Sequence, residues 1–417
     1  MTAVRHVAGQ TGGASRVAAK VISDRAAGEA YVASVCFKHG PPRLLGVELE
    51  YTVHYADDPR RPLQAEDLAR ALGPHAPRTL VPESPAEPLP AGSPLTLEPG
   101  GQVEISALPQ DSLRELERVV SADLDYLSDL LARAGFALGE TGIDPHRRPA
   151  RLLTTERYAT MERRFAPMGT GGITMMCSTA GLQVCVDSGE RDEVATRWAA
   201  VHALGPPLLA TFANSRYHAG SDTGFASARW LAVRDTEHAR TYAAQPFADP
   251  ATGWASRMMD TPLMLVRRPD GPWDAPAGLT FADWVTGRGA AGLLDPPTEA
   301  DLAYHLTTMF TPVRPHGYLE VRYLDAQPGA RWLHPVALLS ALLSSPSIVD
   351  EVLAACEPVL DRWEDAARDG LEDECIAAVA RKVVDLGCAA LPATGLPDST
   401  IDEIGEGVQK LVHAGRG

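Results

Sequence analysis

The stretch Gly46-Val-Glu48-Leu-Glu50 constrains the fold of this chain more than any other feature. It lies in a run, residues 44–53, whose composition is typical of a β-strand. Residues two apart on a strand point to the same face of a sheet, so the carboxylates of Glu48 and Glu50 project together. Like charges placed side by side repel, and burial increases the repulsion. A hard metal ion with oxygen ligands would compensate this charge, and the alternative is an exposed strand edge with two solvated glutamates.

The charge and hydropathy of the whole chain exclude several classes of protein. The 417 residues carry a formal net charge of −16, which disfavours binding to nucleic acid or to an anionic membrane. No apolar run approaches the roughly 18 residues of a membrane span, and the N-terminus lacks the apolar core of a signal peptide. The six cysteines form no CxxC pair and no zinc pattern, so reduced thiols are expected. We therefore expect a cytoplasmic protein that binds neither nucleic acid nor membrane.

The hydrophobic pattern predicts strands separated by long helices rather than a regular β–α–β alternation. Helices are expected at 22–37, at 111–134, at 190–213 with an interruption at Pro206-Pro207, and over most of the chain from 335 onward. Strands are expected at 44–53, 102–106, 173–187 and 316–324. Residues 74–99, which are rich in proline, and residues 245–278 are expected to be irregular connections, the second able to cover a site. This pattern favours an α+β fold with an antiparallel or mixed sheet.

The glycine-rich stretches do not indicate a nucleotide-binding loop. A GxGxxG pattern spans Gly287–Gly292, but Pro296 and Pro297 follow at once and prevent a helix from starting at the glycines. Residues 169–172 can form either an anion-binding nest or a plain turn, and the residues alone favour the turn.

Acidic residues recur on three of the expected strands. Glu48 and Glu50 share a face of the first, Glu104 follows a Gly-Gly turn on the second, and Glu320 shares a face of another with Arg322. Carboxylates hold Mg²⁺, Mg²⁺ holds phosphate oxygens, and an arginine offsets the charge that develops on a transferred phosphoryl group. The alternative for any one of these residues is a surface salt bridge. Together they indicate a phosphoryl-transfer site.

These segments resemble the glutamate–cysteine ligase family over roughly residues 22–330. The resemblance rests on Gly46–Glu50, Pro99–Ser106 and Tyr318–Asp325, which occur in the family's order. Residues 179–187 are similar to the family's substrate strand, and residues 212–215 with 224–229 are similar to its substrate-arginine segment. The branch most resembled is the actinobacterial one of ergothioneine biosynthesis, on the residues Asp24–Tyr31, Cys36-Phe37, Gly40–Arg43, Thr154–Tyr158 and Met161–Phe165.

The resemblance implies a sheet-based fold akin to glutamine synthetase, flanked by helices, and a set of metal ligands. The implied ligands are the family's metal-binding carboxylates, Glu48, Glu50, Glu104 and Glu320, with Glu50 also expected to be essential for catalysis. Glu98 is left open as a further ligand, since its spacing from Glu104 differs among branches of the family.

The resemblance also implies roles for residues that bind the substrates. Arg322 matches an arginine that contacts the phosphates of ATP and supports catalysis. Arg229 matches the arginine that grips the glutamate substrate, and Thr179 and Gln183 lie on the implied substrate strand. The expected organisation is a disordered tail over residues 1–20, a catalytic domain over 21–334, and a helical region over 335–417 that packs on the core.

The implied activity is the ligation of the γ-carboxylate of L-glutamate to the amine of L-cysteine. It requires ATP and two or more Mg²⁺ ions, proceeds through γ-glutamyl phosphate, and gives γ-glutamylcysteine. One alternative is a ligase of the same fold with a different amine acceptor. Another is a phosphotransferase, since related folds host guanidino kinases. A metal- or nucleotide-binding protein without catalytic activity is disfavoured because all four glutamates are present.

Overall fold

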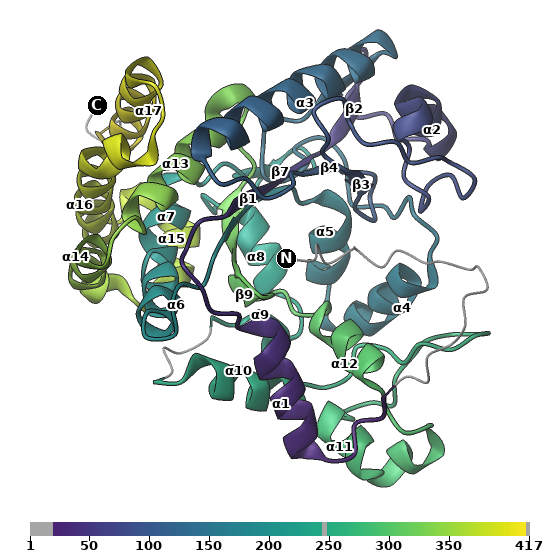
Figure 1. The fold of residues 1–417 in the computed structure, drawn as a ribbon. Coiled ribbons are helices and arrows are strands. Elements are labelled where there is room, and N and C mark those ends of the chain that lie inside the picture. Colours follow the sequence, from purple (N-terminus) through teal and green to yellow (C-terminus); the bar gives the residue numbers. More distant parts are fainter. Residues whose placement is uncertain (1–19, 244–247, 414–417) are drawn as a thin grey trace.

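The computed structural model describes residues 20–243 and 248–413, and a six-stranded antiparallel sheet lies at its centre (Figure 1). The strand order is β3 (Leu95–Leu97), β4 (Val103–Ser106), β1 (Leu45–Tyr51), β6 (Gly181–Val186), β10 (Leu319–Asp325) and β9 (Val313–Pro315). Two smaller sheets pair β2 (Val53–Tyr55) with β5 (Phe136–Leu138), and β7 (Tyr217–His218) with β8 (Ser221–Asp222).

The helices surround this sheet and form the C-terminal part of the chain. They are α1 (Arg25–Cys36), α2 (Ala65–Leu72), α3 (Leu113–Arg133), α4 (Glu156–Phe165), α5 (Gly171–Ser178), α6 (Val194–Ala203), α7 (Gly205–Thr211), α8 (Ala228–Arg234), α9 (His238–Thr241), α10 (Pro250–Asp260), α11 (Phe281–Thr286), α12 (Glu299–Leu306), α13 (Leu333–Leu342), α14 (Pro346–Cys356), α15 (Trp363–Asp369), α16 (Glu374–Ala390) and α17 (Asp398–His413). The prediction of an α+β fold with an antiparallel sheet, flanking helices and a helical C-terminal region is confirmed.

The sheet has one apolar and one polar face. Val47 of β1 is opposite Val184 of β6, which is opposite Val321 of β10, and all three side chains are buried. Helices α3 and α7 pack on this side of the sheet. Because side chains alternate along a strand, the neighbours of these valines point to the other face, and it is there that the acidic residues lie.

Helix α3 begins and ends as its sequence predicts. The side chain of Ser112 accepts a hydrogen bond from the backbone N–H of Glu115, which caps the first turn. Gly135 follows the last turn with φ of +81°, a conformation that favours glycine.

Besides residues 95–97 of the expected irregular connection 74–99, which form strand β3, two predicted segments differ in the structure. The strand expected at 173–187 begins only at Gly181, because residues 171–178 form helix α5, which packs between α4 and α8. Alternation over a few residues does not distinguish a strand from a short helix that is buried on several sides.

The second difference lies in the expected loop 245–278, where residues 250–260 form helix α10. Asp249 caps this helix and Pro250 occupies its first turn, a start signal that the aperiodic composition obscured. The role of this segment as a cover over a site stays a prediction, and residues 244–247 lie outside the described chain.

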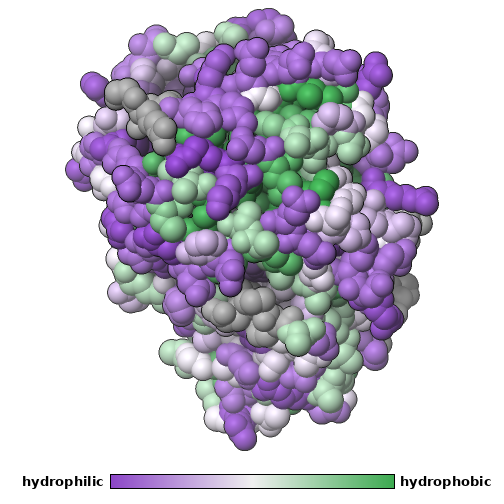
Figure 2. Space-filling view, turned by 90° about the vertical axis from the view of Figure 1, so that its left-hand side faces the viewer, coloured by the Kyte–Doolittle hydropathy of each residue, from purple (hydrophilic) through white to green (hydrophobic). Residues whose placement is uncertain are grey.

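The C-terminal helices share the hydrophobic core of the rest of the chain. Helices α14, α16 and α17 lie together at the left of Figure 1. On the face seen from that side, hydrophilic side chains cover most of the surface, with apolar ones between them (Figure 2). The predicted boundary between residues 334 and 335 stays a prediction, and all but Lys20 of the predicted N-terminal tail lies outside the described residues.

No single helix within residues 20–243 and 248–413 has both the length and the hydropathy needed to cross a membrane. The segments Gly329–Leu342 and Pro346–Val359 meet the length and composition test only when they are taken together, and the chain bends by 107° between them.

Candidate active site

Strand pairing brings the predicted carboxylates onto one face of the sheet. Glu50 of β1 is opposite Glu104 of β4, and Glu48 is opposite Gln183 of β6. Two strands further across, Glu320 of β10 is opposite Cys185 of β6 on one side and Arg314 of β9 on the other. Residues opposite each other on neighbouring strands point to the same side of a sheet, so four strands contribute acidic or cationic groups to one polar face.

The acidic centre of this face consists of Glu50, Glu98 and Glu104. Each offers a carboxylate oxygen, and these oxygens lie within 4.8 Å of one another. Glu50 is fixed on both oxygens, because Oε2 accepts from the backbone N–H of Gly181 at 2.6 Å and Oε1 accepts from Nε2 of Gln183 at 2.7 Å. A divalent cation with oxygen ligands fits such a donor set.

Glu98 reaches this cluster through the tight turn between β3 and β4. The N–H of Glu98 donates to the carbonyl of Gln102, and the N–H of Gly101 donates back to the carbonyl of Glu98, both at 2.9 Å. Only glycine fits at position 100, where a Cβ would lie 2.2 Å from the carbonyl oxygen of Cys177. Gly101 adopts φ of +91°. The Gly-Gly pair therefore turns the chain so that Glu98 and Glu104 meet.

The electrostatics of the acidic residues follow from burial and from their mutual repulsion. Burial, together with the charges of Glu50 and Glu104, raises the pKa of Glu98 well above its usual value. Burial, together with Glu104 and Glu320, does the same to the pKa of Glu48. Without a cation this face therefore resists full ionisation, and a bound cation would remove that resistance.

Glu320 has a different environment, because two guanidinium groups hold it. Arg314 donates through Nε to Oε2 at 2.6 Å and through Nη2 to Oε1 at 2.9 Å, and Nη1 of Arg322 donates to Oε1 at 2.8 Å. Burial would raise the pKa of Glu320, but the positive charges of Arg314 and Arg322 outweigh it and hold the value at about 2. Arg322 also donates to Oε1 of Gln183, whose amide nitrogen donates to Glu50. One hydrogen-bonded chain thus runs from Arg314 to Glu50.

A β-bulge in β10 allows this strand to present three polar residues to the site. Val321 pairs with Val184 and Leu324 pairs with Leu182, so Arg322 and Tyr323 are together opposite Gln183. The extra residue places Asp325 opposite Gly181, on the same side as Gln183. Strict alternation from Arg322 would have turned Asp325 to the apolar face.

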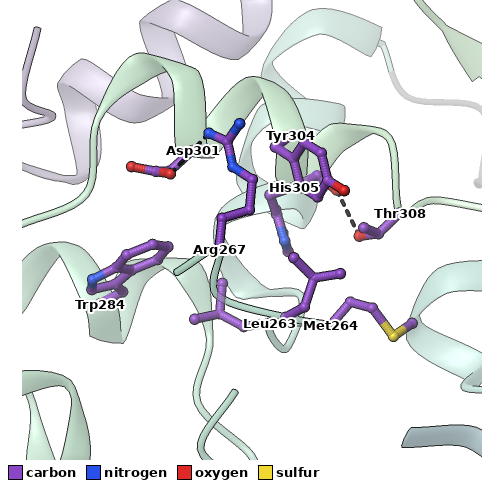
Figure 3. A pocket seen from close by; sticks show the side chains of 9 residues that line it. Leu263, Met264, Arg267, Trp284, Asp301, Tyr304, His305 and Thr308 are labelled. Carbon is purple, nitrogen blue, oxygen red and sulfur yellow. Dashed lines mark hydrogen bonds and ion pairs between the residues drawn. The ribbon is translucent and has the colours of Figure 1, made fainter. Parts of the chain in front are cut away.

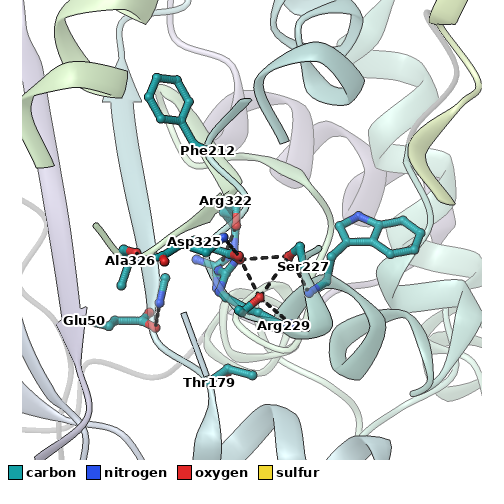
Figure 4. Close-up of polar contacts among 12 residues, drawn as sticks. Glu50, Thr179, Phe212, Ser227, Arg229, Arg322, Asp325 and Ala326 are labelled. Carbon is teal, nitrogen blue, oxygen red and sulfur yellow. Dashed lines mark hydrogen bonds and ion pairs between the residues drawn. The ribbon is translucent and has the colours of Figure 1, made fainter. Parts of the chain in front are cut away.

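Asp325 and Arg229 form a second polar group beside the first. Figure 4 shows Asp325 beside Ser227 and Arg229, with Glu50 on the far side of Arg229 and Arg322. Asp325 accepts from the hydroxyls of Ser215 at 2.7 Å and Ser227 at 2.9 Å, and from the N–H of Asn214 at 2.8 Å. Burial raises the pKa of Asp325 although Arg229 opposes this rise.

The guanidinium of Arg229 is buried and only partly engaged. Its Nη2 donates to the carbonyl of Arg322 at 2.9 Å, its Nη1 lies 3.9 Å from Asp325, and its Nε has no hydrogen-bond partner within the described residues. Arg229 covers Gly181 so closely that a Cβ there would lie 2.2 Å from Nη2. Donors therefore remain for a ligand that enters next to Gly181.

The segment that carries Arg229 is tied to the C-terminal helices. The backbone N–H of Ala226 donates to the carbonyl of Arg368 at 3.0 Å, and that of Ser227 donates to Ala367 at 2.8 Å. Ser227 in turn caps α8, since its hydroxyl accepts from the N–H of Trp230. Helix α15 thus fixes the start of the helix that bears Arg229.

The remaining predicted residues lie near these groups in other roles. The hydroxyl of Thr179 donates to the carbonyl of Met175 at 2.6 Å, so it closes the end of α5. Cys185 is a free thiol on the polar face, and burial, with the charges of Glu48 and Glu320, raises its pKa. Its high pKa keeps this thiol protonated and poorly nucleophilic.

Sequence reasoning missed Arg314 and Asp325 and left Glu98 open. Asp325 ends the quoted segment Tyr318–Asp325, but its face depends on the bulge. Arg314 lies between Pro312 and Pro315, and only the pairing of β9 with β10 shows that it faces Glu320. The turn residues Gly100 and Gly101 were the available signal for Glu98.

A separate small pocket lies among α11, α12 and the segment that follows α10 (Figure 3). Its charged groups satisfy one another: Arg267 pairs with Asp301 at 3.0 Å and lies over the ring of Tyr304, 4.5 Å from its centroid. The pocket therefore offers a ligand no free charge from this pair and differs in kind from the polar face of the sheet.

A protein-family comparison and the curated relatives point to one family. The family described as glutamate-cysteine ligase family 2 matches residues 44–412. Glutamate–cysteine ligase EgtA of Mycolicibacterium smegmatis is 37% identical over 368 residues, which cover 87% of this chain and 84% of the relative. The protein of the same name from Mycobacterium tuberculosis H37Rv is 36% identical over 406 residues, which cover 95% of this chain and 88% of the relative. Among solved structures, glutamate–cysteine ligase from Francisella tularensis in complex with AMP superposes with a TM-score of 0.50 at 12% identity, covers 91% of this chain and 84% of its own, and shows the fold alone.

Proposed function

Because this chain belongs to the glutamate–cysteine ligase family, we propose that it joins the γ-carboxylate of L-glutamate to the amine of L-cysteine, with conversion of ATP to ADP and phosphate. The observation that carries the proposal is the family match over residues 44–412, which includes every strand of the polar face. The product is γ-glutamylcysteine, formed for ergothioneine biosynthesis in the cytoplasm, where thiols stay reduced.

The chemistry requires activation of the carboxylate. A carboxylate oxygen of glutamate attacks the γ-phosphorus of ATP, the bond to ADP breaks, and γ-glutamyl phosphate forms. The lone pair of the cysteine amine then attacks the carbonyl carbon of this acyl phosphate, phosphate leaves with the electrons of the C–O bond, and the amine loses a proton. Several anions meet in the first step, so cationic groups that are already in place lower the barrier.

Arg322 is the cationic group best placed for this task. Glu320 and Gln183 orient its guanidinium, and its side chain keeps 18% of its surface exposed. It would stabilise the charge on the phosphoryl group without reorganising during the reaction. Arg229 would bind a carboxylate of glutamate through its unused donors next to Gly181.

Mg²⁺ is part of the proposal. Glu50, Glu98 and Glu104 would hold an ion, and Glu48 and Glu320 remain the other predicted ligands. When bound, Mg²⁺ would supply positive charge to the phosphate oxygens of ATP. The like charges and the raised pKa of Glu98 support this assignment, since both are relieved by a cation.

The test is phosphate release from the purified protein with Mg²⁺, ATP and L-glutamate, with and without L-cysteine, and mass analysis of the product. Phosphate release that depends on cysteine, with γ-glutamylcysteine formed, is the expected result. Turnover that requires another amine in place of cysteine would contradict the assignment of cysteine as the acceptor. A stable phosphorylated product without free phosphate would favour the phosphotransferase instead.

A further inference from the structure

Arg314 is a half-buried cation, with 20% of its side chain exposed, that none of the roles above uses. It lies on the edge strand β9, directly opposite Glu320 of β10. Its two contacts to Glu320, at 2.6 and 2.9 Å, use Nε and Nη2 against the two carboxylate oxygens. Such a two-pronged pair fixes the plane of the carboxylate as well as its position.

Glu320 passes this restraint to Arg322. Only 1% of the Glu320 side chain is exposed, so water does not orient it. Its Oε1 accepts from both Arg314 and Arg322, and Arg322 reaches Gln183 on the neighbouring strand. If Arg314 were absent, the carboxylate of Glu320 would be free to turn, and Arg322 would lose a fixed partner.

The charges of the three groups give the second part of the argument. The charges of Glu320 and Arg322 alone would sum to zero, and the carboxylate would cancel the field of Arg322 at a bound phosphate. With Arg314 the group Arg314–Glu320–Arg322 carries one net positive charge. Within a desolvated site, that charge is directed at an anion far more effectively than in water.

We propose that Arg314 is a positioning residue that acts through Glu320 and makes the charge and orientation of Arg322 available to the transferred phosphoryl group. The inference rests on the proposed function, since it takes ATP as the phosphoryl donor. Arg314 itself need not touch the nucleotide, and this distinguishes it from Arg322.

A double-mutant cycle tests this role. We would measure kcat and the KM values for ATP and glutamate in the wild type, Arg314→Gln, Arg322→Gln and the double variant. Misplacement of a catalytic group by about 1 Å costs on the order of 10²-fold in rate, so Arg314→Gln is expected to lower kcat by roughly that factor and to leave the KM for glutamate unchanged. Because Arg314 acts through Arg322, the double variant should be no slower than Arg322→Gln alone.

Two further variants separate positioning from folding. Arg314→Lys keeps the charge but cannot make the two-pronged contact, so it should recover only part of the lost kcat. Arg240→Gln is the control. Arg240 is a fully buried arginine outside the polar face, and its Nε lies 2.6 Å from Oε2 of Glu237. It should lower the unfolding temperature and leave kcat of the folded protein unchanged. If Arg314→Gln does not fold, the same cycle is run with Arg314→Lys.

Losses in kcat that multiply in the double variant would overturn the proposal, because Arg314 would then act independently of Arg322. So would a rise in the KM for ATP caused by the Arg314 change in the Arg322→Gln background, which would indicate direct contact with the phosphates. Calorimetric binding of Mg²⁺-ADP to the same four proteins repeats the cycle without turnover. Failure of the wild type to use cysteine would therefore count against the proposed function alone, whereas additive losses of ADP affinity would count against Arg314.

Discussion

Replacing Glu98 by glutamine should stabilise the metal-free protein and weaken its response to Mg²⁺. Carboxylate oxygens of Glu50, Glu98 and Glu104 lie within 4.8 Å of one another. At that distance, and with an effective dielectric constant of about 20, each ionised pair repels by about 3.5 kcal/mol. Glu98 relieves part of this by retaining a proton, as the direction of its pKa shift indicates, so the stabilisation at pH 8 should be about 1–3 kcal/mol.

The sign of the pH dependence follows from the raised pKa of Glu98. A carboxyl group whose pKa is higher in the folded than in the unfolded state favours folding at low pH, and this contribution is lost as the pH rises through the folded value. The contribution of Glu98 to the stability of the metal-free wild type should therefore fall from about pH 4.5 upward. The Glu98→Gln variant lacks this loss, so the difference between the two proteins should grow with pH.

Thermal unfolding at pH 5 and pH 8, with and without Mg²⁺, measures these effects. For a chain of this length, 1–3 kcal/mol corresponds to roughly 1–3 °C in the unfolding midpoint. Mg²⁺ at about 100 times its Kd should stabilise the wild type by about 2.7 kcal/mol, and the same concentration should stabilise the variant by clearly less. Glu351→Gln, an exposed change on α14, is the control for loss of one charge. A lower midpoint for Glu98→Gln at pH 8 without metal, or an equal response of both proteins to Mg²⁺, would refute the reasoning.

Three further changes probe the polar face. Glu50→Gln should reduce phosphate release at saturating Mg²⁺ by a factor on the order of 10² or more and leave the fold intact, because both oxygens of Glu50 are already fixed for ligation; near-normal turnover would contradict the metal assignment. Arg229→Ala should raise the KM for glutamate far more than the KM for ATP in steady-state kinetics. An equal rise in both KM values would show that Arg229 does not bind glutamate. Gly181→Ala should have a similar but smaller effect on the KM for glutamate, because the new methyl group would lie 2.2 Å from Nη2 of Arg229 and push the guanidinium aside. An unchanged KM would show that glutamate binding does not depend on the position of this guanidinium.

The sequence predicted those parts of the site that depend on alternation within one strand. Glu48 and Glu50 share a face because they are two residues apart, and the Gly-Gly turn before Glu104 was recognisable as a strand start. The order of the strands is a property of the assembled sheet, so the pairing of Glu320 with Arg314 could not be read from the chain. The face of Asp325 depends on a bulge, which breaks the periodicity on which such predictions rest.

Helix predictions succeeded where caps and periodicity agreed and failed where they did not. Residues 113–133 carry both an apolar stripe and a capping serine, and the helix forms as expected. Residues 171–178 have no side-chain cap and are buried against two other helices, so neither local signal marks them as helical. Tertiary packing decided their conformation.

The hydrogen bonds from Ala226 and Ser227 to α15 have a consequence for any shortened form of the protein. A chain that ended at residue 334 would keep every predicted ligand and both site arginines, yet it would lose the carbonyls of Ala367 and Arg368. It would also lose Trp363, whose ring packs 5.4 Å from that of Tyr323 in the bulge of β10. The end of the site that holds Arg229 and the strand that bears Arg322 are thus both supported by residues beyond the last motif. Truncation, domain exchange or fusion at residue 334 would keep the sequence motifs of the enzyme and remove the contacts that hold them in place.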